Sequence, residues 1–494
     1  MRLGFDNDKY LNMQSEHIRR RIDEFGGKLY LELGGKLFDD YHASRVLPGF
    51  RPDSKLQMLL QLADKAEVVI VIAASDIERN KVRSDLGITY DQDVMRLIDS
   101  FRSVGLYVGS VVLTMFDQAH EESVKFKKYL ESCGIPVYLH YTISGYPSNV
   151  EKIVSDEGYG KNEYIQTSRE LVIVTAPGPG SGKMATCLSQ LYHEHRRGIR
   201  AGYAKFETFP IWNLPLKHAV NLAYEAATTD LDDVNMIDPY HLEAYGSTAV
   251  NYNRDVEIFP VLEAIFTKIY GYCPYKSPTD MGVNMAGNCI FDDDAVTDAA
   301  SQEIIRRYYT ALVSEAKGKV SQDIVYKQEL IMKKAGLTSA DRPVVASALN
   351  KAQETDAPAA AIMLHDGRII TGKTTDLLGS CSSMLLNSLK VLAQIPDCID
   401  LLSESVIRPI HQLKTKYLGS KNPRLHMDEV LHALAICAST SDTARLAMDQ
   451  LDKLRDCEAH STVILSHADN SMFKKLGIHL TCEGKYQNDS LFHL

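Results

Sequence analysis

Short apolar runs rich in β-branched residues alternate with amphipathic stretches from residue 28 to about residue 210. Such alternation is typical of a parallel sheet whose strands are connected by helices. The runs at 68–72 and 171–174 are apolar at every position, as expected of central strands covered on both faces. The expected strands are Leu29–Leu33, Val68–Ala73, Tyr107–Met115, Pro136–Tyr141, Leu171–Thr175 and Arg200–Phe206, and the expected helices are Lys55–Lys65, Asp91–Ser103 and Glu121–Ser132. Residues 1–215 are therefore predicted to form an α/β domain.

The pattern changes after Pro215, where helical spacing replaces the continuous β-branched runs for more than a hundred residues. Residues 216–350 are predicted to form a helical domain, and residues 351–494 a third domain of the α+β type. Asp366-Gly367 is a strong hairpin signal between two short apolar runs of this third domain. The predicted fold class is thus α/β, a mostly parallel sheet flanked by helices, with a helical domain and a C-terminal α+β domain. The expected helices are Leu216–Thr228, Val256–Tyr270, Asp298–Ala316, Ser321–Ala335, Ser382–Gln394, Met427–Ala438 and Ser441–Arg455, and the expected late strands are Ala359–His365, Arg368–Thr371, Ser461–Ser466 and His479–Cys482.

Composition narrows the class of protein. The 494 residues include 54 Lys and Arg against 64 Asp and Glu, a net charge of -10, with no basic stripe that would neutralise phosphates of a nucleic acid. The nine cysteines are an odd number without a C-x-x-C pair, which is typical of a reducing compartment. No apolar signal segment or membrane-spanning run is present. We therefore expect a cytoplasmic protein that acts on a small molecule, with neither nucleic-acid nor membrane partners.

The segment 171–186 carries the most informative motif. A buried strand is followed by Gly178, Pro179, Gly180, Ser181, Gly182 and Lys183, and then by a stretch with helical spacing. In a phosphate-binding loop, glycines allow backbone N–H groups to converge on phosphate oxygens, and a lysine adds a positive charge at the start of the helix. These six residues are therefore candidate ligands of a nucleotide, ATP in the first place.

Two departures from the phosphate-loop pattern leave an alternative open. Pro177 replaces the first glycine, and Met184 replaces the Ser or Thr that binds Mg²⁺, while Thr186 comes two residues late. The alternative is a glycine-rich strand-to-helix turn with an incidental lysine. The run Arg197–Thr208, in which Lys205 follows Gly-Tyr, resembles the second strand of the dethiobiotin-synthetase-like enzymes, so the loop resembles a deviant phosphate loop of that class.

Two other loops follow predicted strands, where α/β sheets place their ligands. The loop after the first strand contains Asp39, Asp40 and His42, which together with Lys183 are the candidate catalytic residues; a solvated connector is the alternative. The loop after the second strand contains Arg79, Lys81 and Arg83. Their spacing by two places three cations on one side of an extended segment, suited to an anion, although a mixed-charge surface loop has the same pattern.

Acidic residues are densest between positions 230 and 243. Asp230, Asp233 and Asp238 are candidate Mg²⁺ ligands, since oxygen-rich groups suit a Mg²⁺ shared with phosphates and Met184 cannot supply a hydroxyl. Acids that cap the start of a helix explain part of this cluster equally well.

Three segments taken together, Lys36–Phe50, Ala176–Lys183 and Ile464–Asp469, resemble a bacterial protein family of unknown function over the full length of the chain. The resemblance implies a cytoplasmic bacterial protein with α/β, helical and α+β parts, and it implies no activity. Our first hypothesis is a nucleotide-dependent small-molecule ligase or kinase that uses ATP, with Mg²⁺ as a possible cofactor. The alternative is a regulatory protein that holds a nucleotide or another anion without turning it over. A homo-oligomer is possible.

Overall fold

The computed structural model describes residues 2–34, 37–38, 40–83 and 86–487, and the chain divides into two compact units. We call Leu3–Tyr224 together with Asp232–Thr297 the N-terminal unit, and Glu225–Leu231 together with the chain from Asp298 onward the C-terminal unit. The chain passes from one unit to the other within helix α9, Ala219–Ala227, and again within helix α13, Asp293–Ala316. The segment 216–350, expected to form a domain of its own, is distributed over both units.

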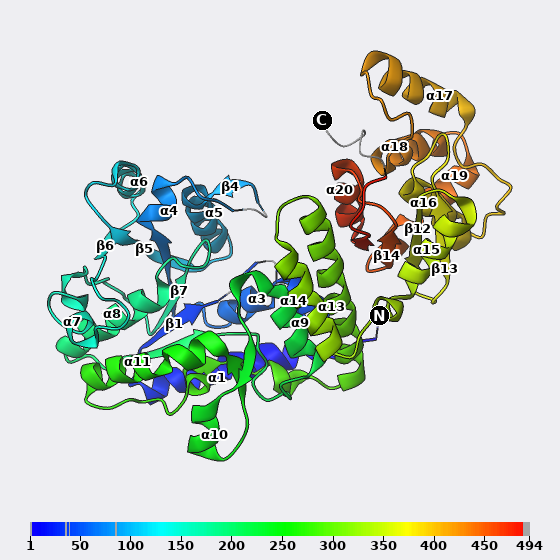
Figure 1. Ribbon diagram of the computed structural model, residues 1–494. Coiled ribbons are helices and arrows are strands. Elements are labelled where there is room, and N and C mark those ends of the chain that lie inside the picture. The colour runs from blue at the N-terminus through cyan, green and yellow to red at the C-terminus, as the bar shows by residue number, and fades with distance from the viewer. Residues whose placement is uncertain (1, 35–36, 39, 84–85, 488–494) are drawn as a thin grey trace. The chain divides into compact units, whose positions relative to one another are not determined.

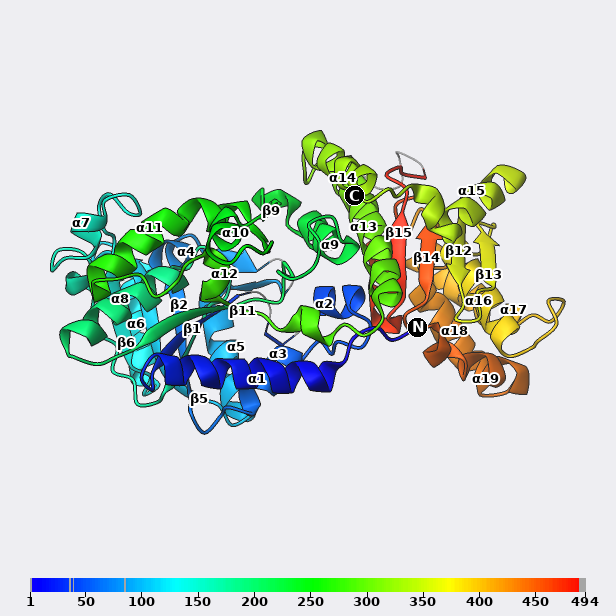
Figure 2. The ribbon, with the colours of Figure 1, turned by 90° about the horizontal axis from the view of Figure 1, so that it is seen from below.

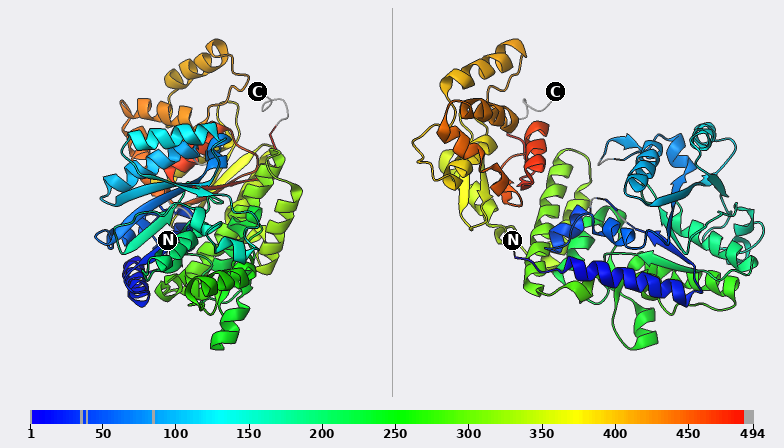
Figure 3. Two further views of the ribbon diagram at one scale, coloured as in Figure 1. Left: turned by 90° about the vertical axis from the view of Figure 1, so that its left-hand side faces the viewer. Right: turned by 180° about the vertical axis from the view of Figure 1, so that it is seen from behind.

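The N-terminal unit is built on a seven-stranded parallel sheet with the order β11-β8-β1-β7-β2-β5-β6 (Figure 1). This sheet confirms the predicted α/β class, and its strands lie side by side with the usual twist (Figure 3, left). Every residue of β2 and β7 is buried, as the apolar runs predict. The strands are β1 Leu29–Leu33, β2 Ala66–Ala73, β5 Tyr107–Phe116, β6 Val137–Tyr141, β7 Leu171–Thr175, β8 Gly202–Phe206 and β11 Gly282–Val283.

Helices cover both faces of this sheet. On one face, Tyr30, Val172, Val174 and Tyr203 pack in a single hydrophobic cluster with residues of α8 and α11. On the other side runs α1, Asn7–Glu24, a helix that the sequence reading omitted (Figures 2 and 3). The remaining α-helices of the unit are α2 Tyr41–Val46, α3 Ser54–Leu60, α4 Ala74–Glu78, α5 Tyr90–Ser103, α6 Glu121–Ser132, α7 Val150–Ile153, α8 Lys183–Arg196, α10 Pro239–Tyr245, α11 Asn253–Tyr270 and α12 Pro278–Met281.

The segment expected to be purely helical also contains short strands. Besides β11, the N-terminal unit has the antiparallel pair β9 Asn235–Ile237 and β10 Val250–Tyr252, and a second small pair, β3 Val82–Arg83 with β4 Ile88–Thr89, lies earlier in the chain. Strands of two or three residues leave no recognisable period in the sequence, so periodicity alone could not have found them.

The C-terminal unit contains a four-stranded mixed sheet with the order β13-β12-β14-β15 (Figure 2). Alternate residues of β12 face opposite layers: Ala360 and Ile362 pack in the main core with α16 and α18, whereas Ala361 packs against α15. The predicted hairpin is confirmed, since β12 and β13 are antiparallel. Strand β14 begins at Glu458, three residues before the predicted start of the strand at Ser461. The strands are β12 Ala359–Met363, β13 Ile369–Lys373, β14 Glu458–Ser461 and β15 His479–Cys482. The helices are α14 Gln322–Lys334, α15 Pro343–Thr355, α16 Ser380–Leu392, α17 Glu404–Gln412, α18 Met427–Ala438, α19 Asp442–Met448 and α20 His467–Leu476. Helices α9 Ala219–Ala227 and α13 Asp293–Ala316 are shared between the two units.

All nine cysteines are free thiols in the structure. Among the described residues, no helix combines the length and the apolar character needed to cross a membrane.

The packing of β13 against α16 generates a prediction for Gly372. A Cβ atom built on Gly372 would lie 2.1 Å from the backbone nitrogen of Met384, and neither backbone can move without opening the core. Gly372→Ala is therefore expected to destabilise the C-terminal unit by about 2–3 kcal/mol, measured by urea unfolding of the full chain. Gly379→Ala is the matched control, because its Cβ would meet nothing closer than 3.8 Å. Since Gly379 is the N-cap of α16, this change should lower the unfolding free energy by about 1 kcal/mol at most, clearly less than Gly372→Ala. Equal stability of the two variants would contradict this account of the packing.

Candidate functional site

The candidate site lies at the carboxyl edge of the central sheet in the N-terminal unit, where β1, β7 and β8 end. Strand β1 pairs with β7 on one side and with β8 on the other, and all three run in the same direction. The segments that follow them therefore leave the sheet at the same edge. This is the edge at which parallel α/β sheets bind ligands.

The glycine-rich loop after β7 joins the strand to helix α8. Gly182 has a φ of +86° and precedes α8, which starts at Lys183 and runs for 14 residues. The hydroxyl of Ser181 donates a hydrogen bond to the carbonyl of Gly178 over 2.8 Å, and the carbonyl of Ser181 accepts one from Thr114 over 2.7 Å. The loop is thus held by one hydrogen bond within itself and by one from Thr114 of β5. Pro179 and Gly180, at the tip of the loop, are exposed to solvent.

The loop after β2 brings one of its three cations to the glycine-rich loop. The side chain of Tyr90, the first residue of α5, lies so close to Gly178 that a Cβ there would be 2.3 Å from its hydroxyl oxygen. The ammonium of Lys81 lies 4.8 Å from the centre of the Tyr90 ring, and it also pairs with Asp76 over 3.2 Å. Lys81 therefore lies on the other side of a ring that contacts the glycine-rich loop.

The other two cations do not join Lys81 in one row. Arg83 forms an ion pair with the buried Asp93 over 2.7 Å, and Arg79 is an exposed residue at the end of α4. The three cations therefore do not form the expected row on one side of an extended loop, because Arg79 caps the end of α4 and Asn80 has a φ of +47°, so the segment is not extended there.

The candidate catalytic acids after β1 are placed differently from the expectation. Asp39 lies outside the described residues. Asp40 caps the start of α2 and pairs with Lys55 over 2.8 Å. Burial alone would raise the pKa of Asp40, but the ammonium of Lys55 and the α2 cap hold it below its usual value. Asp40 is thus a structural ion pair, and His42 packs its ring edge-on against Phe209.

The three candidate metal ligands do not come together. Asp230 belongs to the C-terminal unit, whereas Asp233 and Asp238 belong to the N-terminal unit. Asp233 forms an ion pair with Arg254, and Asp238 caps α10 and accepts a hydrogen bond from the hydroxyl of Thr279 over 2.6 Å. In the part of the chain that the structure describes, no group of three or more His, Cys, Asp or Glu side chains is arranged to hold a metal ion. The helix-capping alternative describes Asp238.

A cluster of buried charges that the sequence reading omitted lies at the same edge of the sheet. Glu32 of β1 and Lys205 of β8 are register partners, so both side chains lie on the face covered by α8 and α11. The ammonium of Lys205 pairs with Glu207 over 2.6 Å and with Asp255, in the first turn of α11. We call Glu32, Lys205, Glu207 and Asp255 the Lys205 cluster.

The Lys205 cluster contains three carboxylates and one ammonium, and the pKa values of Glu207 and Lys205 are both raised. Burial raises the pKa of Glu207 to about 7; Lys205 opposes this shift and Asp255 adds to it. Burial would lower the pKa of Lys205, but the three carboxylates outweigh that effect and raise it, so Lys205 stays charged. Glu207 is the member of the cluster that exchanges a proton near neutral pH.

Electrostatics connect this cluster to the glycine-rich loop. The thiol of Cys187, one helical turn after Lys183, is completely buried and its pKa is raised mainly by burial. The carboxylate of Glu32 raises it further and the ammonium of Lys183 lowers it. Charges of the glycine-rich loop and of the Lys205 cluster therefore both act on the Cys187 thiol.

The sequence does contain a signal for this cluster, namely charged residues inside otherwise apolar strands. Glu32 interrupts the run Leu-Tyr-Leu-Glu-Leu, and Lys205 interrupts Gly-Tyr-Ala-Lys-Phe. A charge buried in a central strand requires a partner from another element. What the sequence could not show was the partner, because Asp255 lies 50 residues further along the chain.

Comparison with known proteins covers both units. A family model described as the domain of unknown function DUF1846, N-terminal, matches residues 3–336, and its C-terminal counterpart matches residues 340–492. The chain is 57% identical over 492 residues to a UPF0371 protein of Corynebacterium efficiens, covering 100% of this chain and 99% of that one. It is 54% identical over 490 residues to a UPF0371 protein of Streptococcus pyogenes serotype M5, covering 99% of each.

The raised pKa of Glu207 generates a prediction for the pH dependence of stability. A carboxyl group with a higher pKa in the folded than in the unfolded state stabilises the fold below its unfolded pKa, and this contribution is lost as the pH rises through the folded value. Compared with Glu207→Gln, the wild type should therefore lose on the order of 2–3 kcal/mol of unfolding free energy between pH 4.5 and pH 8, measured by urea unfolding.

Glu157→Gln is the control for this measurement, since Glu157 is exposed to solvent. That variant should follow the wild type across the whole pH range. A constant difference between wild type and Glu207→Gln at every pH would show that Glu207 titrates at an ordinary value.

Proposed function

The chain belongs to the DUF1846 family over nearly its whole length. From the geometry of the glycine-rich loop we propose that it is a nucleotide-binding enzyme of the small-molecule ligase or kinase type. The glycine-rich loop from Gly178 to Gly182 would bind the phosphates, ATP being the first candidate. Lys183 would supply the positive charge at the start of α8.

One observation carries the proposal: the glycine-rich loop ends the central strand β7 and begins a helix of 14 residues, at the carboxyl edge of a parallel sheet. Backbone N–H groups at the start of such a helix have no partner within the helix, and the helix dipole favours an anion there. Lys81, which lies over the ring of Tyr90 and pairs with Asp76, brings a second cation near the loop. A phosphate group fits this combination of donors and charges.

The Lys205 cluster would serve the acceptor substrate. Phosphoryl transfer depends on positioning and on neutralisation of charge, and it also requires that the attacking group lose a proton. Glu207, with its pKa near 7, is suited to accept that proton at neutral pH. Mg²⁺, if it takes part, would be bound largely by phosphate oxygens and water.

A second candidate function rests on residue Met184. A phosphate loop that turns over a nucleotide normally has a hydroxyl at this position to bind Mg²⁺, and a methionine provides none. Thr186, the nearest hydroxyl after it, is completely buried. This observation favours a regulatory protein that binds a nucleotide or another anion without hydrolysing it. Mg²⁺-dependent release of phosphate from ATP by the purified protein would favour the enzyme over this candidate.

We propose that either activity takes place in the cytoplasm on a small-molecule ligand. The support is the odd number of free thiols and the acidic net charge, which argues against a nucleic-acid partner. A homo-oligomer stays a possibility that gel filtration with light scattering would test.

The sharpest test concerns Lys183. Lys183→Ala removes a positive charge at a helix start, where the lysine opposes the helix dipole, so the unfolding free energy should change by less than about 0.5 kcal/mol. Affinity for ATP or ADP, measured by calorimetry, should fall by about 1.5–3 kcal/mol, which is tenfold or more.

Lys128→Ala is the matched control, because Lys128 is an exposed lysine on α6 of the same unit. It should bind nucleotide as the wild type does. If Lys183→Ala and the wild type, both folded, bind nucleotide equally, the loop from Gly178 to Lys183 does not bind phosphate.

Met184→Ser separates the two candidate functions. If the missing hydroxyl is what prevents Mg²⁺-dependent turnover, this variant should hydrolyse ATP at least tenfold faster than the wild type while nucleotide affinity stays within a factor of about three. An enzyme that already works without that hydroxyl should gain nothing from the change.

A further inference from the structure

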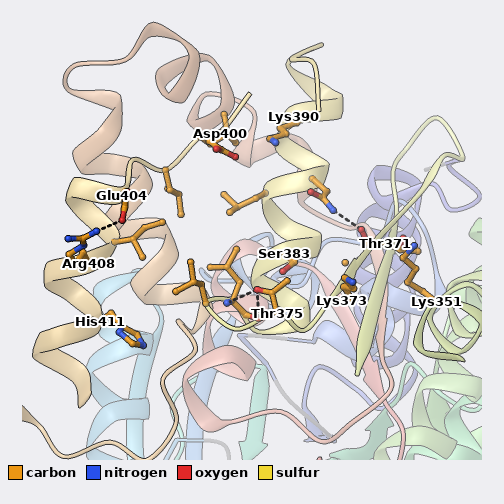
Figure 4. Close-up of a pocket in the computed structure, with 18 residues that line it drawn as sticks. Lys351, Thr371, Lys373, Thr375, Ser383, Lys390, Asp400, Glu404, Arg408 and His411 are labelled. Atoms are coloured by element: carbon orange, nitrogen blue, oxygen red, sulfur yellow. Dashed lines mark hydrogen bonds and ion pairs between the residues drawn. The ribbon is translucent and has the colours of Figure 1, made fainter. Parts of the chain in front are cut away.

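The C-terminal unit contains a cavity of about 710 Å³ that is separate from the nucleotide site (Figure 4). Its walls come from α15, β13, α16 and α17, and from the segments before α16 and α17. The volume is within the range of ~300–1,000 Å³ that small-molecule sites occupy. Every residue that lines it belongs to the C-terminal unit.

The floor of this cavity is apolar. Leu386, Leu401 and Leu402 line it, and all three are members of the main hydrophobic core of the unit. Leu378 and Ile407 line it as well and are only partly buried. The cavity is therefore bounded on one side by residues of the hydrophobic core. A ligand with an apolar body would be stabilised by contact with these residues.

Positive charge gathers at one end of the cavity. Lys351 of α15 and Lys373 of β13 lie together at that end (Figure 4). The ammonium of Lys373 makes no hydrogen bond or ion pair with any residue that the structure describes. Lys351 has only an exposed partner, Glu354, at 3.3 Å. Neither lysine is neutralised within the cavity.

A hydroxyl without a partner also lines the cavity. The Oγ atom of Ser383 is buried from solvent and has no hydrogen-bond partner among the described residues. Ser383 belongs to α16, which packs against the face of β13 on which Gly372 lies, whereas Lys373, the next residue of the strand, lies on the opposite face. A buried hydroxyl without a partner is costly, and an acceptor atom from a ligand would satisfy it.

The opposite wall is electrically balanced. Arg408 and Glu404 of α17 form an ion pair with each other on that side (Figure 4). Lys390 donates a hydrogen bond to the carbonyl of Asp397 over 2.8 Å, and Asp400 lies near it at the top of the cavity. The surplus of positive charge is therefore confined to the end formed by Lys351 and Lys373.

We propose that this cavity binds a small amphipathic anion. Its apolar body would lie on Leu386, Leu401 and Leu402, and its carboxylate or phosphate group would lie between Lys351 and Lys373. Both the apolar floor and the one-sided charge are required, so neither an uncharged alkyl compound nor inorganic phosphate satisfies the site.

Calorimetry on the full chain with four probes tests the proposal: octanoate, octyl phosphate, 1-octanol and inorganic phosphate. Octanoate or octyl phosphate should bind at least tenfold more tightly than 1-octanol and than inorganic phosphate, and the tighter of the two identifies the anionic group. The double variant Lys351→Gln/Lys373→Gln should bind that probe at least tenfold more weakly and 1-octanol unchanged. Both lysines are at least partly accessible to solvent, so the double variant should fold normally.

Lys475→Gln is the matched control, as Lys475 is an exposed lysine of the same unit that does not line the cavity. It should bind the probes as the wild type does, and so should Lys183→Ala, which makes this test independent of the nucleotide proposal. Absence of binding by both anionic probes, equal affinity for octanoate and 1-octanol, or full affinity in the double variant would each overturn the inference.

Discussion

All seven strands of the central sheet run in one direction, and this constraint determines where the chemistry of the N-terminal unit lies. Parallel strands need crossover connections, so both faces are covered by helices, and the strands β1, β2 and β7 are buried at every residue. Polar groups can then reach solvent only at the two ends of the strands. Strands β1, β7 and β8 lie next to one another at the centre, so the glycine-rich loop and the Lys205 cluster meet at the same edge although their residues come from positions 32 to 255.

The sequence was sufficient for the elements with a strong period and insufficient for the partners between them. Strands β1 and β7 begin and end at the predicted residues, as do helices α6 and α18, because a run buried on both faces or an amphipathic stripe has its signal within the element itself. The glycine-rich turn was identified for the same reason. The partner of Lys205, by contrast, depends on how α11 packs against the sheet, and no local pattern contains that information.

Local chemistry also explains why several expected site residues have structural roles. An aspartate before a helix is an equally good ligand and helix cap, and Asp40 and Asp238 both act as caps. Alternating cations suit an anion only if the segment is extended, and here Arg79 caps helix α4 while Asn80 has a φ of +47°. In each case the residue types were compatible with a site, but the backbone conformation decided their role.

The net charge of the Lys205 cluster affects both parts of the candidate site, the cluster itself and the glycine-rich loop. Burying one ammonium with three carboxylates leaves an excess of negative charge, which costs free energy unless a proton or a cation compensates for it. Burial, with a further contribution from Asp255, raises the pKa of Glu207, because a proton on this carboxyl removes one negative charge. A phosphate bound at the glycine-rich loop would add negative charge and favour that proton further, whereas a cation arriving with the phosphate would release it. If the proposed ligand binds at Lys183, its charge would therefore be coupled to proton binding at Glu207, and the sign of the coupling would depend on the net charge that enters the site.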